Sequence, residues 1–307
     1  MRAISTLLLL SLFLPGPCDG QKRGAMNDLS SQINVARHSV VAIAIKVMDW
    51  NPLPPVCPWT ENQMCIVGTG SIVDNKGTVV TAWHVANDAR KLAQNFEQAH
   101  RMVLSVIMFE IPNFDGQLGS VKVENTANFN AVAYKILAED KAHDLALLHP
   151  EVKDPFESMA GAPLVANDNQ TTERAKPTPA TLLTTRPVDG LEVFTCGYPF
   201  GQKALTTTSG FVATAWGQEN LVVAGQNGIS GVTNVYRLDV RANPGNSGGP
   251  VFERKAGAII GIIVEIAQSG GGGLAIAVPS SYVADLMKAN DLIWSTPNSP
   301  PNKKGKS

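Results

Sequence analysis

The chain has 307 residues, of which 44% are hydrophobic and 17% are charged, the ordinary balance of a soluble globular protein. Its formal net charge is −1, and Lys and Arg cluster only at the extreme C-terminus, which argues against a nucleic-acid partner. Gly (27) and Pro (20) are plentiful and long stretches of helical periodicity are few, so we expect many short strands joined by turns.

Residues 1–20 have the pattern of a signal peptide: a basic residue after the first Met, an apolar run over 4–14, and then a break of Pro, Gly and Asp. The apolar run is about half of the roughly 20 residues that a membrane-spanning helix needs, so a retained anchor is less favoured. Lipidation at Cys18 is also disfavoured, because Pro17 precedes it. We expect cleavage near Gly20 and a secreted or periplasmic mature protein without a membrane span.

The mature chain would keep three cysteines, an odd number for an oxidising compartment. Cys57 and Cys65 bracket a short loop and are the expected disulfide pair, with two free thiols as the alternative. Cys196 lies in an apolar run and is expected to be buried and unreactive. None of the three has the spacing of a metal site, and we expect no metal or other cofactor.

A polar extension at 21–32 is expected to precede a first lobe at 33–161. A helix of good helix-forming residues is predicted from 85 to about 100. The strands of this lobe, rich in apolar residues and separated by turn residues, are predicted at 39–47, 68–73, 78–82, 102–111, 130–137 and 144–148. Residues 162–190 are rich in Thr, Pro, Asn and Asp, which is typical of a connection across the surface between two lobes.

The second lobe, 191–292, again alternates turns and strands. It ends in a helix predicted at 280–292, with Ser280 or Ser281 as its N-cap. The polar tail at 293–307 has little to bury and is expected to be disordered.

The segment NPGNSGGP, residues 243–250, places Ser247 in a glycine-rich turn immediately before a strand. Gly245, Gly248 and Gly249 permit backbone angles that other residues resist, and they leave room for a substrate carbonyl. The amides of Gly245 and Ser247 could then form an oxyanion hole. The alternative is an ordinary glycine turn with an exposed serine.

The order of the histidines separates two hydrolase classes that this turn could serve. The turn also fits the G-x-S-x-G pattern of α/β hydrolases, in which the base follows the serine. Here every histidine precedes Ser247, which excludes that class: His38, His84, His100, His143 and His149. A subtilisin-type order would need an acid before the base, and Asp74 lies in a turn without subtilisin-like surroundings.

The remaining order is His, Asp, Ser. His84 lies where an apolar strand ends and a helix begins, which gives it a rigid mount on each side. Asp144 heads an apolar strand, where a buried carboxylate needs a partner that an imidazole could provide. We therefore predict a triad of His84, Asp144 and Ser247 in a cleft between the lobes, and surface, boundary or strand-flanking roles for the other histidines.

Three segments together resemble the trypsin-like (chymotrypsin-fold) serine peptidases, and most closely their HtrA-type bacterial branch: GTGSIVDNKGTVVTAWHVA, HDLALL and LDVRANPGNSGGPVF. The segments GIIVEIA and GLAIAVPSS resemble the family's substrate-binding strands and closing turn. The resemblance implies an all-β fold of two six-stranded antiparallel β-barrels with a C-terminal helix. It also implies a serine endopeptidase that acts on polypeptide substrates through an acyl-enzyme. The alternative is a catalytically reduced member of this fold that binds proteins.

The chain departs from parts of the family pattern. Digestive members carry an aspartate just before the serine, whereas this chain has Asn246, so no salt-bridge activation switch is expected. Residues 66–68 look like an activation terminus but are interpreted as the interior of a strand. The HtrA resemblance usually brings a PDZ domain, but only about 15 residues follow the closing helix, so we expect none here.

Specificity is predicted from the resemblance. Arg241 stands where trypsin carries the aspartate that selects basic side chains, so a preference for Lys or Arg is disfavoured. The pocket would lie near Asn243, Val264, Ile266 and Ile276, which predicts a small apolar side chain at the cleavage site. An inward-turned Arg241 would favour acidic side chains instead.

Overall fold

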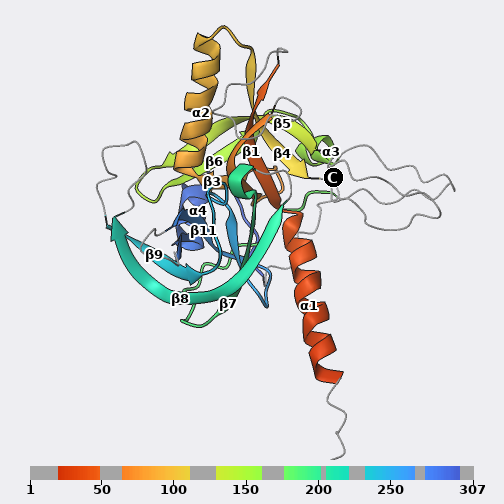
Figure 1. Cartoon of the computed structure of the whole chain (residues 1–307), viewed down its shortest axis with the longest axis vertical. Coiled ribbons are helices and arrows are strands. Elements are labelled where there is room, and N and C mark those ends of the chain that lie inside the picture. The colour runs from red at the N-terminus through yellow and green to blue at the C-terminus, as the bar shows by residue number, and fades with distance from the viewer. Residues whose placement is uncertain are drawn as a thin grey trace, which may run out of the picture.

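A computed structural model describes residues 20–48, 64–110, 129–160, 176–201, 205–220, 232–266 and 274–297. Twelve strands in these ranges form two closed antiparallel barrels of six strands each (Figure 1). The expected all-β double-barrel fold with a C-terminal helix is therefore confirmed.

The first barrel has the strand order β1-β2-β3-β6-β5-β4. Its strands are β1 (Val40–Val47), β2 (Met64–Ile72), β3 (Val79–Ala82), β4 (Val103–Glu110), β5 (Phe129–Asp140) and β6 (Leu145–Pro150). Closure of the barrel pairs every strand edge and so removes the unpaired backbone groups of an open sheet. In the register of β3 against β6, Ala82 lies opposite Leu145, so the end of β3 adjoins the start of β6.

The second barrel has the strand order β10-β11-β12-β9-β8-β7. Its strands are β7 (Glu192–Gly197), β8 (Thr206–Asn220), β9 (Val232–Asp239), β10 (Pro250–Glu253), β11 (Ile259–Ile266) and β12 (Ala275–Pro279). The long strand β8 curves around the outside of this barrel in Figure 1. The glycine turn at 243–249 connects β9 to β10 and belongs to this barrel.

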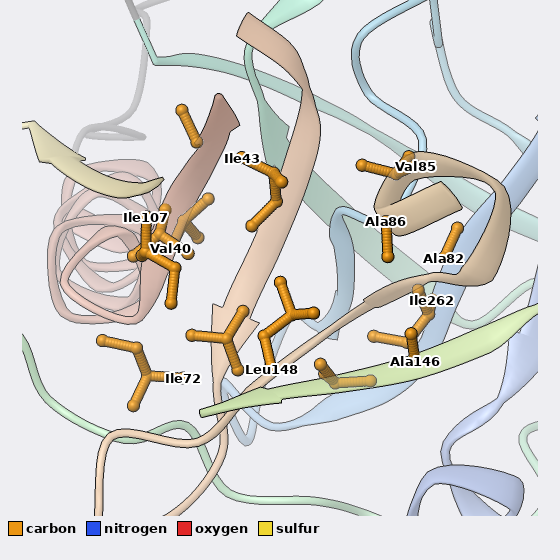
Figure 2. Close-up of a cluster of buried hydrophobic side chains, with 14 of the residues drawn as sticks. Val40, Ile43, Ile72, Ala82, Val85, Ala86, Ile107, Ala146, Leu148 and Ile262 are labelled. Atoms are coloured by element: carbon orange, nitrogen blue, oxygen red, sulfur yellow. The ribbon is translucent and has the colours of Figure 1, made fainter. Parts of the chain in front are cut away.

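One buried hydrophobic cluster runs from the first barrel into the second. Ile262 of β11 lies among Ala82 of β3 and Ala146 of β6 (Figure 2), and β3 and β11 are in contact. Removal of this apolar surface from water holds the barrels against each other. Side chains from different barrels are thereby kept at a fixed separation.

Four α-helices occur in the described ranges: α1 (Gly20–Arg37), α2 (Trp83–Gln98), α3 (Pro155–Met159) and α4 (Ser280–Ala289). Helix α2 confirms the helix predicted after the first lobe's third strand, although it begins two residues earlier. None of the described helices is both long and apolar enough to cross a membrane.

The expected polar extension at 21–32 lies in helix α1, which was not predicted. The helix runs away from the barrels in Figure 1, and Leu29 and Ile33 near its C-terminal end pack against the core. Ala36 of the same helix is also buried, but a few apolar contacts at one end of a helix are too few to produce a clear helical period in the sequence.

Helix α4 confirms the closing helix but corrects its cap. The N-cap residue is Pro279, and no side chain caps the helix. The Ser280 hydroxyl instead donates to the carbonyl of Leu183, at 2.7 Å, and so attaches the helix to the connection between the barrels. The helix ends at Ala289, three residues before the predicted end.

The expected disordered tail begins too early. Trp294 packs against the core, and the carbonyl of Ser295 accepts a hydrogen bond from the Leu182 amide, at 2.9 Å. The Trp294 side chain buries apolar surface, although the composition of 293–307 as a whole is polar. The rest of the tail from 298, the expected signal peptide up to residue 19, and Cys57 lie outside the described residues.

Candidate active site

His84 and Asp144 form a two-point contact at the adjoining ends of β3 and β6. The His84 Nδ1 atom lies 2.7 Å from Asp144 Oδ2, and the His84 backbone amide donates to Asp144 Oδ1, at 2.8 Å. The Asp144 side chain is only 2% exposed, whereas that of His84 is 18% exposed. A carboxylate that accepts at Nδ1 fixes the imidazole ring and leaves Nε2 as the nitrogen that can accept a proton.

The turn between β5 and β6 holds Asp144 in an unusual conformation. Asp144 has a φ of 53°, in the left-handed region, and its carbonyl accepts from the Trp83 amide at 2.9 Å. Earlier in the turn, Asp140 Oδ2 lies 2.6 Å from His143 Nδ1. Burial alone would raise the pKa of Asp140, but hydrogen bonds from the His143 ring and amide, together with the His143 charge and the Ala142 amide, hold it below its usual value.

The turn around Ser247 has the geometry for which its glycines are needed. The Asn246 amide donates to the Asn243 carbonyl at 2.9 Å, and Gly245 between them has a φ of 99°. A proline followed by a glycine at positive φ is the residue pattern of a type II turn. Gly248 also has a positive φ, of 81°, and a Cβ atom there would collide with the first barrel.

Two backbone donors of this turn are available. Among the described residues, the amides of Gly245 and Ser247 donate no hydrogen bond, whereas the Asn246 amide between them does. The Ser247 carbonyl accepts from the amide of Thr69 in β2, at 3.0 Å, so the turn is attached directly to the first barrel. The structure therefore brings the turn of the second barrel against the barrel that carries His84 and Asp144.

The structure shows the surroundings of Asn246 and Ile66, the two residues considered above for a salt-bridge activation switch. Asn246 is 5% exposed, and its Oδ1 atom has no hydrogen-bond partner among the described residues. Ile66 lies inside β2 and pairs with Ala44 of β1, which confirms the interpretation of 66–68 as strand interior. A cut before Ile66 would divide β2. Thr69, in the part of β2 after the cut, donates to the Ser247 carbonyl.

The predicted specificity residues occupy different environments. Val264 in β11 and Ile276 in β12 are buried on neighbouring strands. Asn243 is half-buried, and Arg241 is exposed. Ile266 ends β11, and its side chain lies outside what the structure describes.

Cys196 confirms its predicted environment. It is a free, buried thiol, and burial raises its pKa to about 11, opposed by a hydrogen bond with Thr207 and by the charge of Arg37. The pairing of Cys57 with Cys65 stays a prediction. In the described part of the chain, no group of three or more His, Cys, Asp or Glu side chains could hold a metal ion.

Three of the other histidines lie in different environments. His38 is half-buried at the end of α1, where burial, and then the charge of Arg37, lowers its pKa. His149 lines a cavity of about 420 Å³ beside the β2–β3 turn, at the opposite end of β3 from His84. His143 stacks on Tyr282 of α4. Sequence reasoning did not single out this stack or Thr69, one of two buried polar residues in β2, the other being Ser71.

Comparison with known proteins places the chain in a family. The trypsin-like peptidase domain model matches residues 68–262, more than half of the chain. The magnetosome formation protease MamE of Paramagnetospirillum magneticum is 26% identical over 312 residues, which cover 95% of this chain and 34% of MamE. A probable periplasmic serine endoprotease DegP-like of Chlamydia muridarum is 27% identical over 73% of this chain and 33% of its own length. The chain thus spans about a third of these relatives.

Solved structures share the fold. The HtrA-type protease AlgW with decapeptide matches with a TM-score of 0.54 at 18% identity, over 86% of this chain and 67% of AlgW. The active form of the Rv3671c protease from M. tuberculosis matches with a TM-score of 0.53 at 14% identity, over 96% of each chain. With its family-model match and its two antiparallel barrels, this chain belongs to the trypsin-like peptidase family.

Proposed function

We propose that this protein is a serine endopeptidase that hydrolyses polypeptides through an acyl-enzyme. His84 acts as the base, Asp144 orients and stabilises it, and Ser247 is the nucleophile. The observation that carries the proposal is the two-point contact of His84 with Asp144, which leaves Nε2 as the ring nitrogen able to take the proton of Ser247.

In the first half of the reaction, His84 Nε2 accepts the Ser247 hydroxyl proton as Oγ attacks the peptide carbonyl. The amides of Gly245 and Ser247 donate to the oxyanion that develops on the carbonyl oxygen. The protonated imidazole is stabilised by the buried Asp144 carboxylate, and it then gives its proton to the leaving amine. Loss of one oxyanion donor typically costs about 2.7–4 kcal/mol of transition-state stabilisation, so the turn geometry matters nearly as much as the triad.

In the second half, water attacks the acyl-enzyme while His84 accepts its proton, and Ser247 leaves with that proton restored. Both halves use only side chains and amides of this chain. We further propose a secreted or periplasmic location, from the signal pattern at 1–20 and the similarity to a periplasmic DegP-like relative.

For specificity, we propose a small apolar side chain on the substrate. Val264 and Ile276 are buried apolar residues on neighbouring strands, whereas Arg241 is exposed. A peptide-library cleavage profile tests this, with Arg241→Gln as the companion variant. We expect the same small apolar preference in both proteins. A wild-type preference for acidic side chains that disappears in Arg241→Gln would support the acidic alternative.

The experiment that tests the activity incubates the mature protein with unfolded casein and, separately, with a fluorophosphonate probe. We expect casein cleavage and covalent labelling, both abolished in Ser247→Ala. Circular dichroism shows whether each sample is folded. A folded wild-type protein that neither cleaves nor labels would overturn the peptidase proposal and leave a protein-binding role for the two barrels.

A further inference from the structure

Thr69 of the first barrel contacts the Ser247 turn of the second barrel at two points. Its side chain is fully buried, and its hydroxyl donates to the carbonyl of Gly245, at 2.7 Å. Its backbone amide donates to the carbonyl of Ser247, at 3.0 Å. One residue thus holds both ends of the three-residue segment that carries the two available amides.

Because peptide bonds are planar, these contacts also restrict the directions of the Gly245 and Ser247 amides. In a trans peptide the carbonyl and the following N–H point in opposite directions, so an anchored carbonyl also fixes the next amide. The Thr69 hydroxyl anchors the Gly245 carbonyl and so fixes the peptide between Gly245 and Asn246. That peptide lies between the two donor amides, and its rotation would turn them away from each other.

The direction of the Thr69 hydroxyl is set by a second neighbour. The amide of Tyr198 donates to Thr69 Oγ1, at 3.1 Å, so the hydroxyl accepts there and directs its own proton to Gly245. The short turn that follows, Pro199–Gly201, presents the Phe200 amide to the carbonyl of Pro244. This contact fixes the peptide that precedes Gly245, and therefore the direction of the Gly245 donor.

The surroundings leave Thr69 little freedom to move. The Thr69 carbonyl accepts from the Thr81 hydroxyl of β3, at 2.6 Å. Gly197 and Gly248 approach so closely that a Cβ atom on either would press against Thr69. The hydroxyl is therefore held at a fixed place between the turn at 198–201 and the Ser247 turn.

We infer that Thr69 is a positioning residue for the oxyanion hole: its hydroxyl, set by the Tyr198 amide, keeps the Gly245 and Ser247 amides convergent. The inference rests on the proposed peptidase function. Thr69 does not touch the substrate. Its removal should slow the chemical step and leave substrate binding largely unchanged, because the hydroxyl bonds the Gly245 carbonyl and the Tyr198 amide rather than the predicted specificity residues Val264 and Ile276.

The test compares Thr69→Val with Thr195→Val. Thr195 is also buried, and its hydroxyl also donates to a backbone carbonyl, that of Pro250 at 2.8 Å, so the same substitution removes the same kind of bond. A second pair, Thr69→Ser and Thr69→Ala, differs only in the hydroxyl and covers the case in which the valine variant does not fold. The readouts are the maximal rate and the half-saturating concentration of fluorophosphonate labelling, with the rate of casein cleavage.

We expect the maximal labelling rate to fall about 10- to 100-fold in Thr69→Val, because a small displacement of catalytic groups has effects of this size. The half-saturating concentration should change less than about twofold, since binding is not affected. Thr195→Val should keep its rate within about twofold, and Thr69→Ser should exceed Thr69→Ala by about tenfold or more.

The experiment separates failure of the positioning role of Thr69 from failure of the peptidase proposal. If the wild-type protein cleaves and labels normally while Thr69→Val matches Thr195→Val, or Thr69→Ala matches Thr69→Ser, the positioning role is wrong and the peptidase proposal stands. If the folded wild-type protein does neither, the peptidase proposal itself fails and the inference fails with it.

Discussion

His143 lies flat on Tyr282, with the ring centroids 3.8 Å apart and the planes inclined by 21°. His143 belongs to the turn that carries Asp144, whereas Tyr282 belongs to the closing helix α4. Tyr282 in turn accepts a hydrogen bond from Asn234 of β9, at 3.1 Å. The turn of the first barrel that presents the candidate acid is thus supported by the C-terminal helix and the second barrel.

Loss of this stack should loosen the Asp144 turn. We expect Tyr282→Leu to lower the free energy of unfolding by about 0.5–1.5 kcal/mol beyond its lost area, because it removes a stacked aromatic pair. Tyr282→Phe keeps the stack, loses only the bond from Asn234, and should cost about 0.5–1.5 kcal/mol. Urea unfolding measures stability, and casein cleavage should fall severalfold only in Tyr282→Leu. Equal activity in the two variants would contradict a role of the stack in holding Asp144.

Asp144→Asn should nearly abolish activity without unfolding the protein. An amide at this position can favour the wrong histidine tautomer, a change that typically costs about 10⁴ in kcat. Asp189→Asn is the control, because Asp189 is an exposed acid of the inter-barrel connection that accepts from the Ala215 amide, and its change should leave cleavage unaffected. Full activity of Asp144→Asn at neutral pH would show that another group supports His84.

Two glycines with positive φ allow backbone strain to be separated from steric collision. Gly190 has a φ of 81° with open space around its Cβ position, so Gly190→Ala should cost about 1–2 kcal/mol of unfolding free energy. Gly245 has a φ of 99°, and a Cβ atom there would collide with the Tyr198 carbonyl. Gly245→Ala should therefore destabilise the protein more, and it should abolish fluorophosphonate labelling. Thermal unfolding compares the two variants. Equal melting temperatures would mean that the turn at Tyr198 moves to accommodate the new Cβ atom, and they would contradict the predicted collision.

The lowered pKa of Asp140 predicts an acid-sensitive contribution to stability. The contribution is fully present above the ordinary carboxyl pKa of 3.8, and it is lost as the pH falls through the lower pKa of the folded state. Asp140→Asn should therefore be less stable than the wild-type protein at pH 6, and the difference should shrink below pH 3.8. Urea midpoints measured between pH 6 and pH 2.5 check this, and a difference that grows at low pH would contradict it.

Cys196 should resist modification in the folded protein. Its pKa of about 11 keeps the thiol protonated near neutral pH, and it is buried. We expect iodoacetamide to modify Cys196 only after denaturation, as peptide mapping by mass spectrometry would detect. The same map should recover Cys57 linked to Cys65.

Cys196 should also make stability depend on alkaline pH. Because the pKa of its thiol is raised in the folded protein, stability from the neutral thiol is present below pH 9.0 and is lost as the pH rises towards about 11.

Local patterns predicted the strands well, because alternating and apolar runs between turn residues depend mainly on nearby sequence. They failed where a few long-range contacts decide the outcome. Among the described side chains of helix α1, Leu29, Ile33 and Ala36 near its C-terminal end pack on the core, and Trp294 anchors an otherwise polar tail. Ser280 was expected to cap a helix, yet its hydroxyl reaches a carbonyl 97 positions away.

The sequence by itself excluded the α/β-hydrolase class, because all five histidines precede Ser247, and it left the order His, Asp, Ser as its prediction. It also predicted special backbone angles at Gly245 and Gly248, and both residues have a positive φ. The tertiary structure decided how the turn is held. The bond from Thr69 to Gly245 joins residues 176 positions apart, and it exists only because two separately closed barrels share one buried core. No local propensity encodes a contact of that kind.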